Sequence, residues 1–240
     1  MKILITSGGT AEKIDNIRTI VNNSTGRLGC AIASAFVGRP EVERIFYVCG
    51  ERAVRLQEDK VDICQISDVA SLNDAIRGIL SNHNIDIIIH AMAVSDYRVC
   101  AASSVESIAN SADVVQAMEN ANMLGNGKIS SEMEHMVLLL KKNPKIIKMF
   151  SSLAPDATLV GFKLLDNVPR GTLIDAGYKL LMDNGCDFVL ANDATQFGGD
   201  VHIGCLIDKD GNYKEYGTKP EIGRAIVEAT VAYRKGGTDL

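Results

Sequence analysis

Residues 2–10 read Lys-Ile-Leu-Ile-Thr-Ser-Gly-Gly-Thr, a short apolar run that ends at two glycines. A nearly continuous apolar run of this length is typical of a strand that is buried on both faces. Similar runs return along the chain and are separated by amphipathic stretches with helical spacing. This alternation predicts an α/β fold with a mostly parallel sheet between two layers of helices.

The expected elements fill most of the 240 residues. We expect strands at 2–6, 44–49, 61–66, 85–91, 136–140, 158–162 and 187–191. We expect helices at 29–37, 69–80, 114–123, 144–153, 173–183 and 221–233, and a small antiparallel hairpin at 203–216 around Asp210-Gly211. Residues 1–240 are therefore predicted to form a single three-layer, Rossmann-like domain. The polar stretch 103–127 is predicted to be a loop or flap.

Composition excludes several classes of partner. The net charge of −5 disfavours nucleic acid and anionic membranes, and aromatic residues make up only 5% of the chain. The apolar runs are far shorter than the roughly 20 residues that span a bilayer. The six cysteines show neither Cys-x-x-Cys pairs nor zinc spacing. Buried, reduced thiols in a cytoplasmic protein are expected.

Two glycine loops are candidate phosphate sites. Ser7, Gly8, Gly9 and Thr10 follow the first strand, where glycines allow a nest of backbone amides; a tight turn is the simpler alternative. Residues 22–29, Asn-Asn-Ser-Thr-Gly-Arg-Leu-Gly, open a helix whose free N–H groups favour an anion. Together the two loops favour a nucleoside triphosphate.

Further segments carry residues that could bind a nucleotide or a metal-bound water. Residues 91–97 read Ala-Met-Ala-Val-Ser-Asp-Tyr at a strand exit, where Asp96 can hold a metal-bound water or a ribose hydroxyl, or cap a turn. Lys128 follows Gly125-Asn126-Gly127 and can swing onto a phosphate, although a solvated surface lysine is the alternative. Asn143-Pro144 is expected to open a helix and to form a third anion site.

Taken together, these segments resemble the phosphopantothenoylcysteine synthetases, the ligases of coenzyme A biosynthesis. The most specific stretch is 5–29, with Ile14-Asp15, Arg18, Asn22 and the Ser-Thr-Gly-x-x-Gly loop. In order after it come matches at 93–97, 128–129, 142–144, 161–162 and 191–193. The matches cover nearly the whole chain, and their order is more specific than any one of them.

The resemblance implies a reaction. The carboxylate of 4′-phosphopantothenate attacks the α-phosphate of a nucleoside triphosphate and releases pyrophosphate. The amino group of L-cysteine then attacks the acyl-nucleotidylate, which gives an amide and a nucleoside monophosphate. The resemblance also implies Mg²⁺ with the triphosphate, no flavin, and a homodimer in which one subunit helps to close the site of the other.

The resemblance also implies roles for individual residues. Asn22 and Lys128 are the catalytic candidates: Asn22 holds the acyl intermediate, and Lys128 stabilises charge on the α-phosphate. Arg18 and Asn22 are expected to bind the phosphopantothenate side, and Phe162 is expected near the base. With the glycine loops included, the expected nucleotide-binding residues are Ser7, Gly8, Gly9, Thr10, Ser24, Thr25, Gly26, His90, Ala91, Met92, Asp96, Pro144, Lys145, Ile146, Ile147, Phe162 and Lys179. No metal ligands are assigned.

This sequence departs from the family pattern in three places. It begins at the ligase motif, so a stand-alone ligase that works with a separate phosphopantothenoylcysteine decarboxylase is expected. A second nucleotide-contacting lysine is missing, since Asp183 or Asn184 takes its place. The insertion between Asp96 and Lys128 is longer. The resemblance implies CTP for bacterial members and ATP for animal members of the family. CTP is favoured here, and ATP is the alternative, since residues 128–131 and 162–164 look a little like the animal pattern.

Two other functions compete with the ligase. Thr25-Gly26-x-x-Gly29 also suggests a short-chain-dehydrogenase-like NAD(P) oxidoreductase, which needs a tyrosine four residues before a lysine. None of the six tyrosines has a lysine at that spacing. The other alternative is a non-catalytic nucleotide- or flavin-binding module, and a purified flavoprotein would be yellow.

Overall fold

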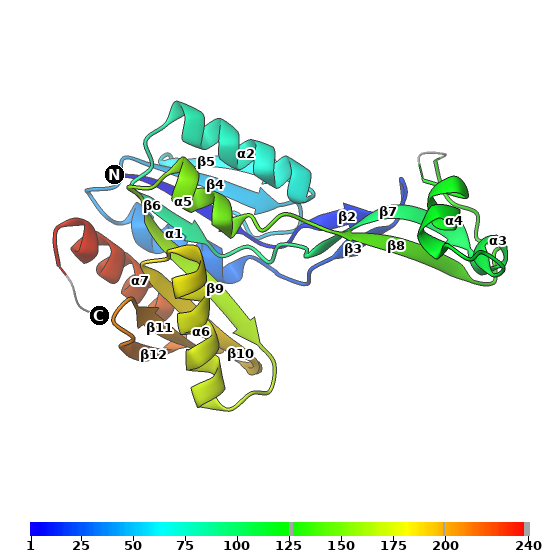
Figure 1. Cartoon of the computed structure of the whole chain (residues 1–240). Helices are drawn as coiled ribbons and strands as arrows, with labels where there is room; N and C mark the ends of the chain where they lie inside the picture. Colours follow the sequence, from blue (N-terminus) through cyan, green and yellow to red (C-terminus); the bar gives the residue numbers. More distant parts are fainter. Residues whose placement is uncertain (125–126, 199, 238–240) are drawn as a thin grey trace.

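The computed structural model describes residues 1–124, 127–198 and 200–237. Its centre is an eight-stranded sheet with the order β12-β11-β10-β9-β6-β1-β4-β5 (Figure 1). The strands are β1 Lys2–Ser7, β4 Arg44–Gly50, β5 Val61–Ile66, β6 Ile87–His90, β9 Thr158–Leu165, β10 Phe188–Gly198, β11 Val201–Asp208 and β12 Tyr213–Thr218. The strands from β10 to β5 are parallel, and β11 and β12 add an antiparallel edge.

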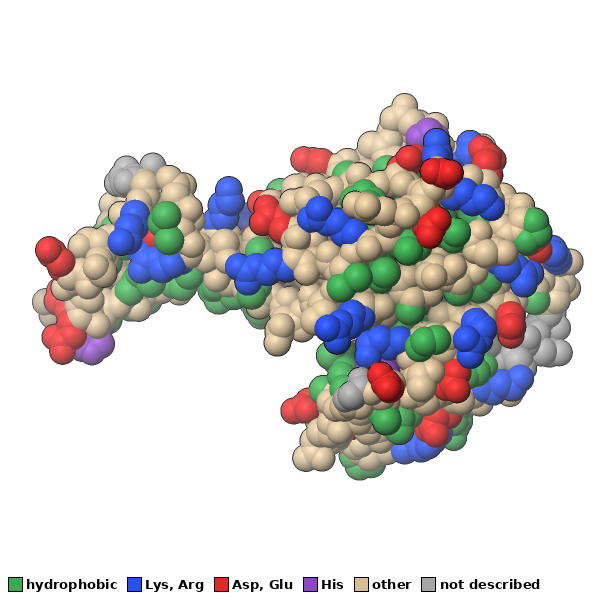
Figure 2. All heavy atoms as spheres, turned by 180° about the vertical axis from the view of Figure 1, so that it is seen from behind, with side chains coloured by type: hydrophobic (Ala, Val, Ile, Leu, Met, Phe, Trp, Pro, Cys, Tyr) green, Lys and Arg blue, Asp and Glu red, His purple; other side chains and the backbone are tan. Residues whose placement is uncertain are grey.

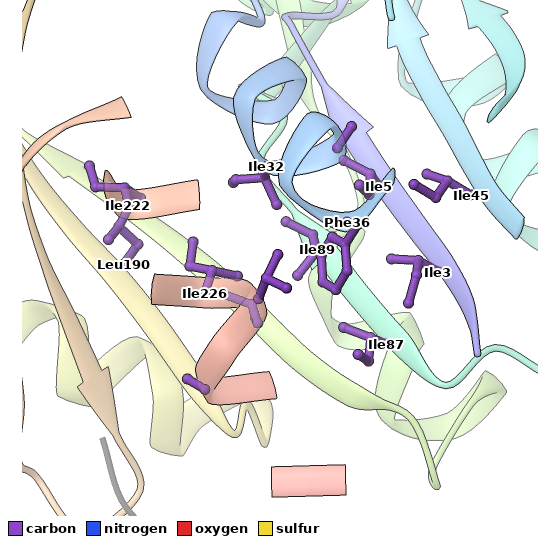
Figure 3. Packing of buried hydrophobic residues seen from close by; sticks show 14 of the residues in the cluster. Ile3, Ile5, Ile32, Phe36, Ile45, Ile87, Ile89, Leu190, Ile222 and Ile226 are labelled. Atoms are coloured by element: carbon purple, nitrogen blue, oxygen red, sulfur yellow. The ribbon is translucent and has the colours of Figure 1, made fainter. Parts of the chain in front are cut away.

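Helices cover both faces of this sheet, so the predicted three-layer fold class is confirmed. On one face, α1 Arg27–Val37 and α7 Lys219–Arg234 pack on β1 and its neighbours (Figure 3). Ile3 and Ile5 of β1 and Ile32 and Phe36 of α1 are fully buried in this layer. Because successive strand residues point to opposite faces, Leu4 lies in the other layer.

The second layer contains α2 Val69–Asn82, α5 Ile147–Leu153 and α6 Arg170–Asn184. Leu72 and Ile76 of α2 and Phe150 of α5 are its most deeply buried side chains. A capping box starts α2, in which Asp68 accepts a hydrogen bond from the backbone N–H of Ser71. Among the described helices, none is both long and apolar enough to cross a bilayer.

Residues 97–142 leave this body as an extended arm (Figure 1). Strands β7 Tyr97–Ser104 and β8 Met136–Lys142 pair antiparallel, and the short helices α3 Val105–Ile108 and α4 Val114–Asn120 lie at the far end. The helix expected at 114–123 is found as α4. The expectation of a loop or flap at 103–127 is corrected, because the described part of this stretch ends β7 and forms α3 and α4 at the tip of a two-stranded ribbon. The predicted strand at 136–140 exists, but it lies outside the main sheet. Gly125 and Asn126, part of the predicted glycine-rich flap, lie outside the described residues.

Two further expectations are corrected. The helix expected from Pro144 begins only at Ile147, because the chain first makes tight turns in which the N–H groups of Lys148 and Met149 donate to the carbonyls of Lys145 and Ile146. Asn143-Pro144 therefore does not open the helix, and an anion site there stays a prediction. A small hairpin, β2 Ala11–Lys13 with β3 Thr19–Val21, was not expected. The six cysteines are free thiols, of which Cys49, Cys186 and Cys205 are buried as predicted, whereas Cys30, Cys64 and Cys100 are only partly buried.

Candidate active site

The strand order reverses between β1 and β6, and the loops that follow these two strands meet there. Such a reversal leaves a crevice at the carboxyl ends of parallel strands. Gly9 bridges Ala93, the N–H of Ala93 donates to the carbonyl of Gly8 at 2.8 Å, and that of Thr10 donates to the carbonyl of Ala93 at 3.2 Å. The first glycine loop and the 91–97 segment are therefore one structure.

The second glycine loop joins them through Asn22. Its N–H donates to the carbonyl of Thr10 at 3.3 Å. A Cβ on Gly9 would lie 2.2 Å from the carbonyl oxygen of Asn22, so only glycine allows this approach. Gly8 has a φ of 82°, which glycine also tolerates best. Gly9 thus allows the two glycine loops to pack closely through their backbones, and this contact fixes the position of the Asn22 backbone.

A buried polar network attaches the fourth segment. The side chains of Thr10 and Ser95 share a hydrogen bond of 2.9 Å. The Asn143 amide donates to the carbonyl of Ser95 at 3.1 Å and to Glu12 at 3.3 Å. Burial raises the pKa of Glu12, which also accepts from the N–H of Val69. Glu12 was not predicted as part of the site, because nothing in the residues next to it indicates that its carboxylate is buried.

Behind these loops lies a small cavity of about 130 Å³, which we call the Phe162 pocket. It is lined by His90, Met92, Val94, Ser95, Asp96, Pro144, Lys145, Ile146, Ile147, Phe162 and Leu180. Eight of these residues were expected to bind nucleotide. At its rim Lys145 forms an exposed ion pair with Asp96. Apolar walls with a few charged groups at the edge are typical of ligand pockets.

A second cavity, of about 280 Å³, is called the Asn22 pocket. It is lined by Gly9, Ala11, Ile17, Thr19, Val21, Asn22, Asn23, Ser24, Thr25, Glu51, Arg52, Ala53 and Ser67. Helix α1 begins beside it with Gly26 as its N-cap and no side-chain cap. Sequence reasoning missed Glu51 and Arg52, although they follow the carboxyl end of a predicted strand, where ligands of parallel sheets bind.

Other predicted residues lie away from the pocket walls. Ser7 and Thr10 are fully buried, and the Ser7 hydroxyl donates to the carbonyl of Gly26. Ala91 continues the β1–β6 contact through its N–H. Lys179 is exposed on α6 and pairs with Asp183. Lys128 is exposed on the arm and lines neither pocket. Their ligand roles stay predictions.

His90 connects the Phe162 pocket to the core. Its Nδ1 lies 2.8 Å from the Thr6 hydroxyl, and its ring meets Phe150 edge-on at 5.3 Å between centroids. Burial lowers the pKa of His90 to about 4. The neutral imidazole is therefore the form that the fold accommodates.

This depressed pKa predicts acid sensitivity. The unfolded chain binds a proton at about pH 6.5, and folded His90 does so only near pH 4. The contribution of neutral His90 to the free energy of unfolding is therefore fully present above about pH 6.5. It is lost as the pH falls, by about 2 kcal/mol at pH 4.5. Urea unfolding of His90→Asn should show a smaller loss than the parent between pH 7 and pH 4.5. The exposed-site control His135→Asn should match the parent, and equal losses in all three proteins would contradict the assignment.

Comparison with known proteins identifies the family. The family model described as the DNA/pantothenate metabolism flavoprotein C-terminal domain matches residues 1–124 and 105–233. The chain belongs to this family. The resemblance to phosphopantothenoylcysteine synthetases is thereby confirmed.

Curated members of the family include two archaeal relatives, each named coenzyme A biosynthesis bifunctional protein CoaBC. The one from Methanocaldococcus jannaschii is 31% identical over 230 residues, which cover 95% of this chain and 49% of the relative. The one from Thermococcus kodakarensis is 32% identical over 209 residues, which cover 87% and 45%. The chain thus spans about half the length of these curated relatives.

Two solved structures share the fold of this chain. The DNA/pantothenate metabolism flavoprotein from Streptococcus pneumoniae is 34% identical, with a TM-score of 0.88 over 97% of this chain and 99% of that one. A Cab2 variant in complex with phosphopantothenate-cysteine has a TM-score of 0.72 over 98% of this chain and 86% of that one. At 17% identity, the Cab2 likeness shows the fold alone.

Proposed function

We propose that this chain joins L-cysteine to 4′-phosphopantothenate at the expense of a nucleoside triphosphate. The observation that carries the proposal is the Phe162 pocket, since four segments far apart in sequence build it and eight of its eleven lining residues were expected to hold a nucleotide. The Asn22 pocket, beside the start of α1, would then hold the phosphopantothenate side. The family's curated relatives carry names of coenzyme A biosynthesis, which agrees with this reaction.

The chemistry proceeds in two balanced steps. A carboxylate oxygen of phosphopantothenate bonds to the α-phosphorus, and pyrophosphate leaves. The cysteine nitrogen then bonds to the acyl carbon, loses a proton, and displaces the nucleoside monophosphate. In this scheme Lys128 stabilises charge on the phosphate, and Asn22 donates its amide to the acyl-nucleotidylate. Arg18 would contribute to binding the phosphopantothenate side.

Mg²⁺ is expected to arrive with the triphosphate. Asp96 offers one carboxylate at the rim of the Phe162 pocket, and the described residues contain no cluster of three or more metal-ligating side chains. This donor set fits Mg²⁺, which commonly binds one or two carboxylates together with substrate phosphates and water. Bound at Asp96, the ion would neutralise phosphate charge.

A direct assay tests the function. The protein is incubated with phosphopantothenate, cysteine and Mg²⁺, with CTP or ATP in parallel, and pyrophosphate release is measured. We expect release with all components present and a higher rate with CTP. Absence of release with both nucleotides would contradict the ligase.

We place the reaction in the cytoplasm, where free thiols persist, and propose a phosphopantothenoylcysteine decarboxylase as the functional partner.

We also propose a homodimer that uses the arm. Figure 2 shows hydrophobic side chains along one edge of the arm, which projects into solvent. Val114 and Val115 of α4 are 51% and 52% exposed, whereas Met118, one turn further along the helix, is buried inside the tip. The arm extends away from the body of its own chain, so its exposed apolar side chains are accessible to a second copy (Figure 1).

Light scattering at low micromolar protein tests the assembly. We expect the mass of two subunits, and a shift toward one subunit in Val115→Lys, because a charge on an apolar contact must be desolvated. Met182→Lys, on the 60% exposed Met182 of α6, is the matched control and should remain dimeric. A single-subunit mass for the fully active parent would contradict the dimer.

A further inference from the structure

Asp15 lies in the turn between β2 and β3 and has a carboxylate that is almost entirely buried. Its side chain is 1% exposed, yet it keeps the Arg18 guanidinium as an ion-pair partner. It also accepts the backbone N–H groups of Ile17 at 2.8 Å and Arg18 at 2.7 Å. Hydrogen bonds from Arg18 are the main reason why the pKa of Asp15 lies well below its usual range. The turn therefore presents a fixed, charged pair.

This pair also binds a segment more than a hundred residues away. The N–H of Ile129 donates to Asp15 Oδ2 at 3.1 Å, and Arg18 Nη2 donates to the carbonyl of Ile129 at 2.9 Å. Both backbone polar groups of Ile129 are thus held by the Asp15–Arg18 pair. Ile129 is buried in a stretch without helix or strand, and the exposed Lys128 precedes it directly.

The same turn belongs to the wall of the Asn22 pocket. Ile17 and Thr19, on either side of Arg18, both line that pocket. The hydrogen bonds to Ile129 therefore connect the Lys128 segment of the arm to a substrate-pocket wall of the body. A lysine is a point charge on a flexible stem, so its effect on a phosphate depends on where its backbone is held.

We propose that Asp15 is a positioning residue, which holds Lys128 in place through Arg18 and the backbone of Ile129. This inference rests on the proposed function, in which Lys128 stabilises charge during nucleotidyl transfer. It gives Arg18 a second task besides the predicted substrate contact, because two of its nitrogen atoms bind Asp15 and Ile129.

We call the hydrogen bonds from Asp15 and Arg18 to the backbone of Ile129 the Ile129 anchor. Asp15→Asn tests this anchor with almost no change in side-chain volume. An amide nitrogen in place of Oδ2 cannot accept the N–H of Ile129, and the charge that orients Arg18 is gone. We expect at least about tenfold faster hydrogen exchange at the Ile129 amide and at least about tenfold faster tryptic cleavage after Lys128. The control Asp208→Asn removes a buried carboxylate that caps the β11–β12 turn and should change neither rate. Unchanged exchange in Asp15→Asn would overturn the proposal.

Kinetics separate positioning from general destabilisation. In Asp15→Asn we expect kcat to fall about tenfold, with the KM for nucleotide within about twofold of the parent. In a Lys128→Gln background the same substitution should cost less than about twofold, since the residue that it positions is already lost. A full further tenfold loss in the double variant would overturn the proposal.

A second variant guards against misfolding. Arg18→Lys keeps the charge but loses the forked contact to Asp15 and Ile129, so it should also speed cleavage after Lys128. If the parent releases no pyrophosphate, the proposed function fails, whereas exchange and proteolysis still report on the anchor. If Ile129 is protected equally in all variants, the anchor fails, whatever the activity.

Discussion

Lys128→Gln is expected to lower the rate of pyrophosphate release by about 100-fold or more and to leave thermal stability unchanged. A fixed cation on a phosphoryl transition state is worth ~3 kcal/mol, by analogy with the loss of one oxyanion-hole donor. Lys128 is exposed in an irregular stretch, so truncation leaves no cavity. Steady-state rates with CTP, together with Tm from thermal unfolding, measure both effects.

The control for this change is Lys214→Gln. Lys214 is an exposed lysine on β12, at the far edge of the sheet from β1, and its loss should keep the parental rate. A loss below tenfold for Lys128→Gln, with the fold intact, would show that Lys128 is a surface residue. The structure adds a reason for care in the assay. Lys128 lines neither pocket of its own chain, so rates should be measured over a range of protein concentrations that would reveal a contribution from the proposed dimer.

Asn22→Asp is expected to preserve the first half-reaction and to slow the second by about 100-fold. The substitution removes an amide donor and places a negative charge beside the mixed anhydride, which costs about as much as the loss of one preorganised donor. The backbone of Asn22 is held against Gly9 and Thr10, so the substituted side chain starts from the same point at the wall of the Asn22 pocket. The expected time course is a burst of pyrophosphate equal to the enzyme concentration, followed by slow turnover in the presence of cysteine.

Asn23→Asp provides the matched comparison. It adds the same charge to the same pocket, one residue along the chain, and should cost much less. Wild-type turnover of Asn22→Asp with cysteine would contradict the assigned role. If both variants were equally slow, the effect would belong to the charge of the pocket and not to the Asn22 amide.

The parallel sheet could be predicted because most of its strands are local apolar runs with clear ends, and the alternating β5 also has strand periodicity. The helices also followed from spacing, and α7 begins within two residues of its expected start. The arm could not be predicted in this way. β7 contains Tyr97, Arg98 and several small residues, and its partner β8 lies beyond the stretch that contains α3 and α4. Pairing of that kind depends on contacts distant in sequence, which local patterns do not encode.

For the candidate site, the sequence predicted most of the Phe162 pocket and part of the Asn22 pocket. What it missed is the network that holds the segments together. Glu12 and Asn143 matter through a hydrogen bond across 131 residues, and Asp15 through one across 114. A carboxylate in a short turn looks the same in sequence whether it faces solvent or a distant backbone amide. Only the tertiary structure separates these cases.

The arm leaves and re-enters the body at neighbouring points. Tyr97 pairs with Lys142, and the N–H of Asn143 donates to the carbonyl of Asp96 at 2.8 Å. None of the eight strands of the main sheet lies between these residues. The arm is therefore an insertion that interrupts none of the strands of the main sheet, and it is joined to the rest of the chain at its base and through the hydrogen bonds of Ile129. Its length can also change by two residues per strand at a time without altering which face each side chain occupies. The length of the arm can thus change without a change in the packing of the main sheet.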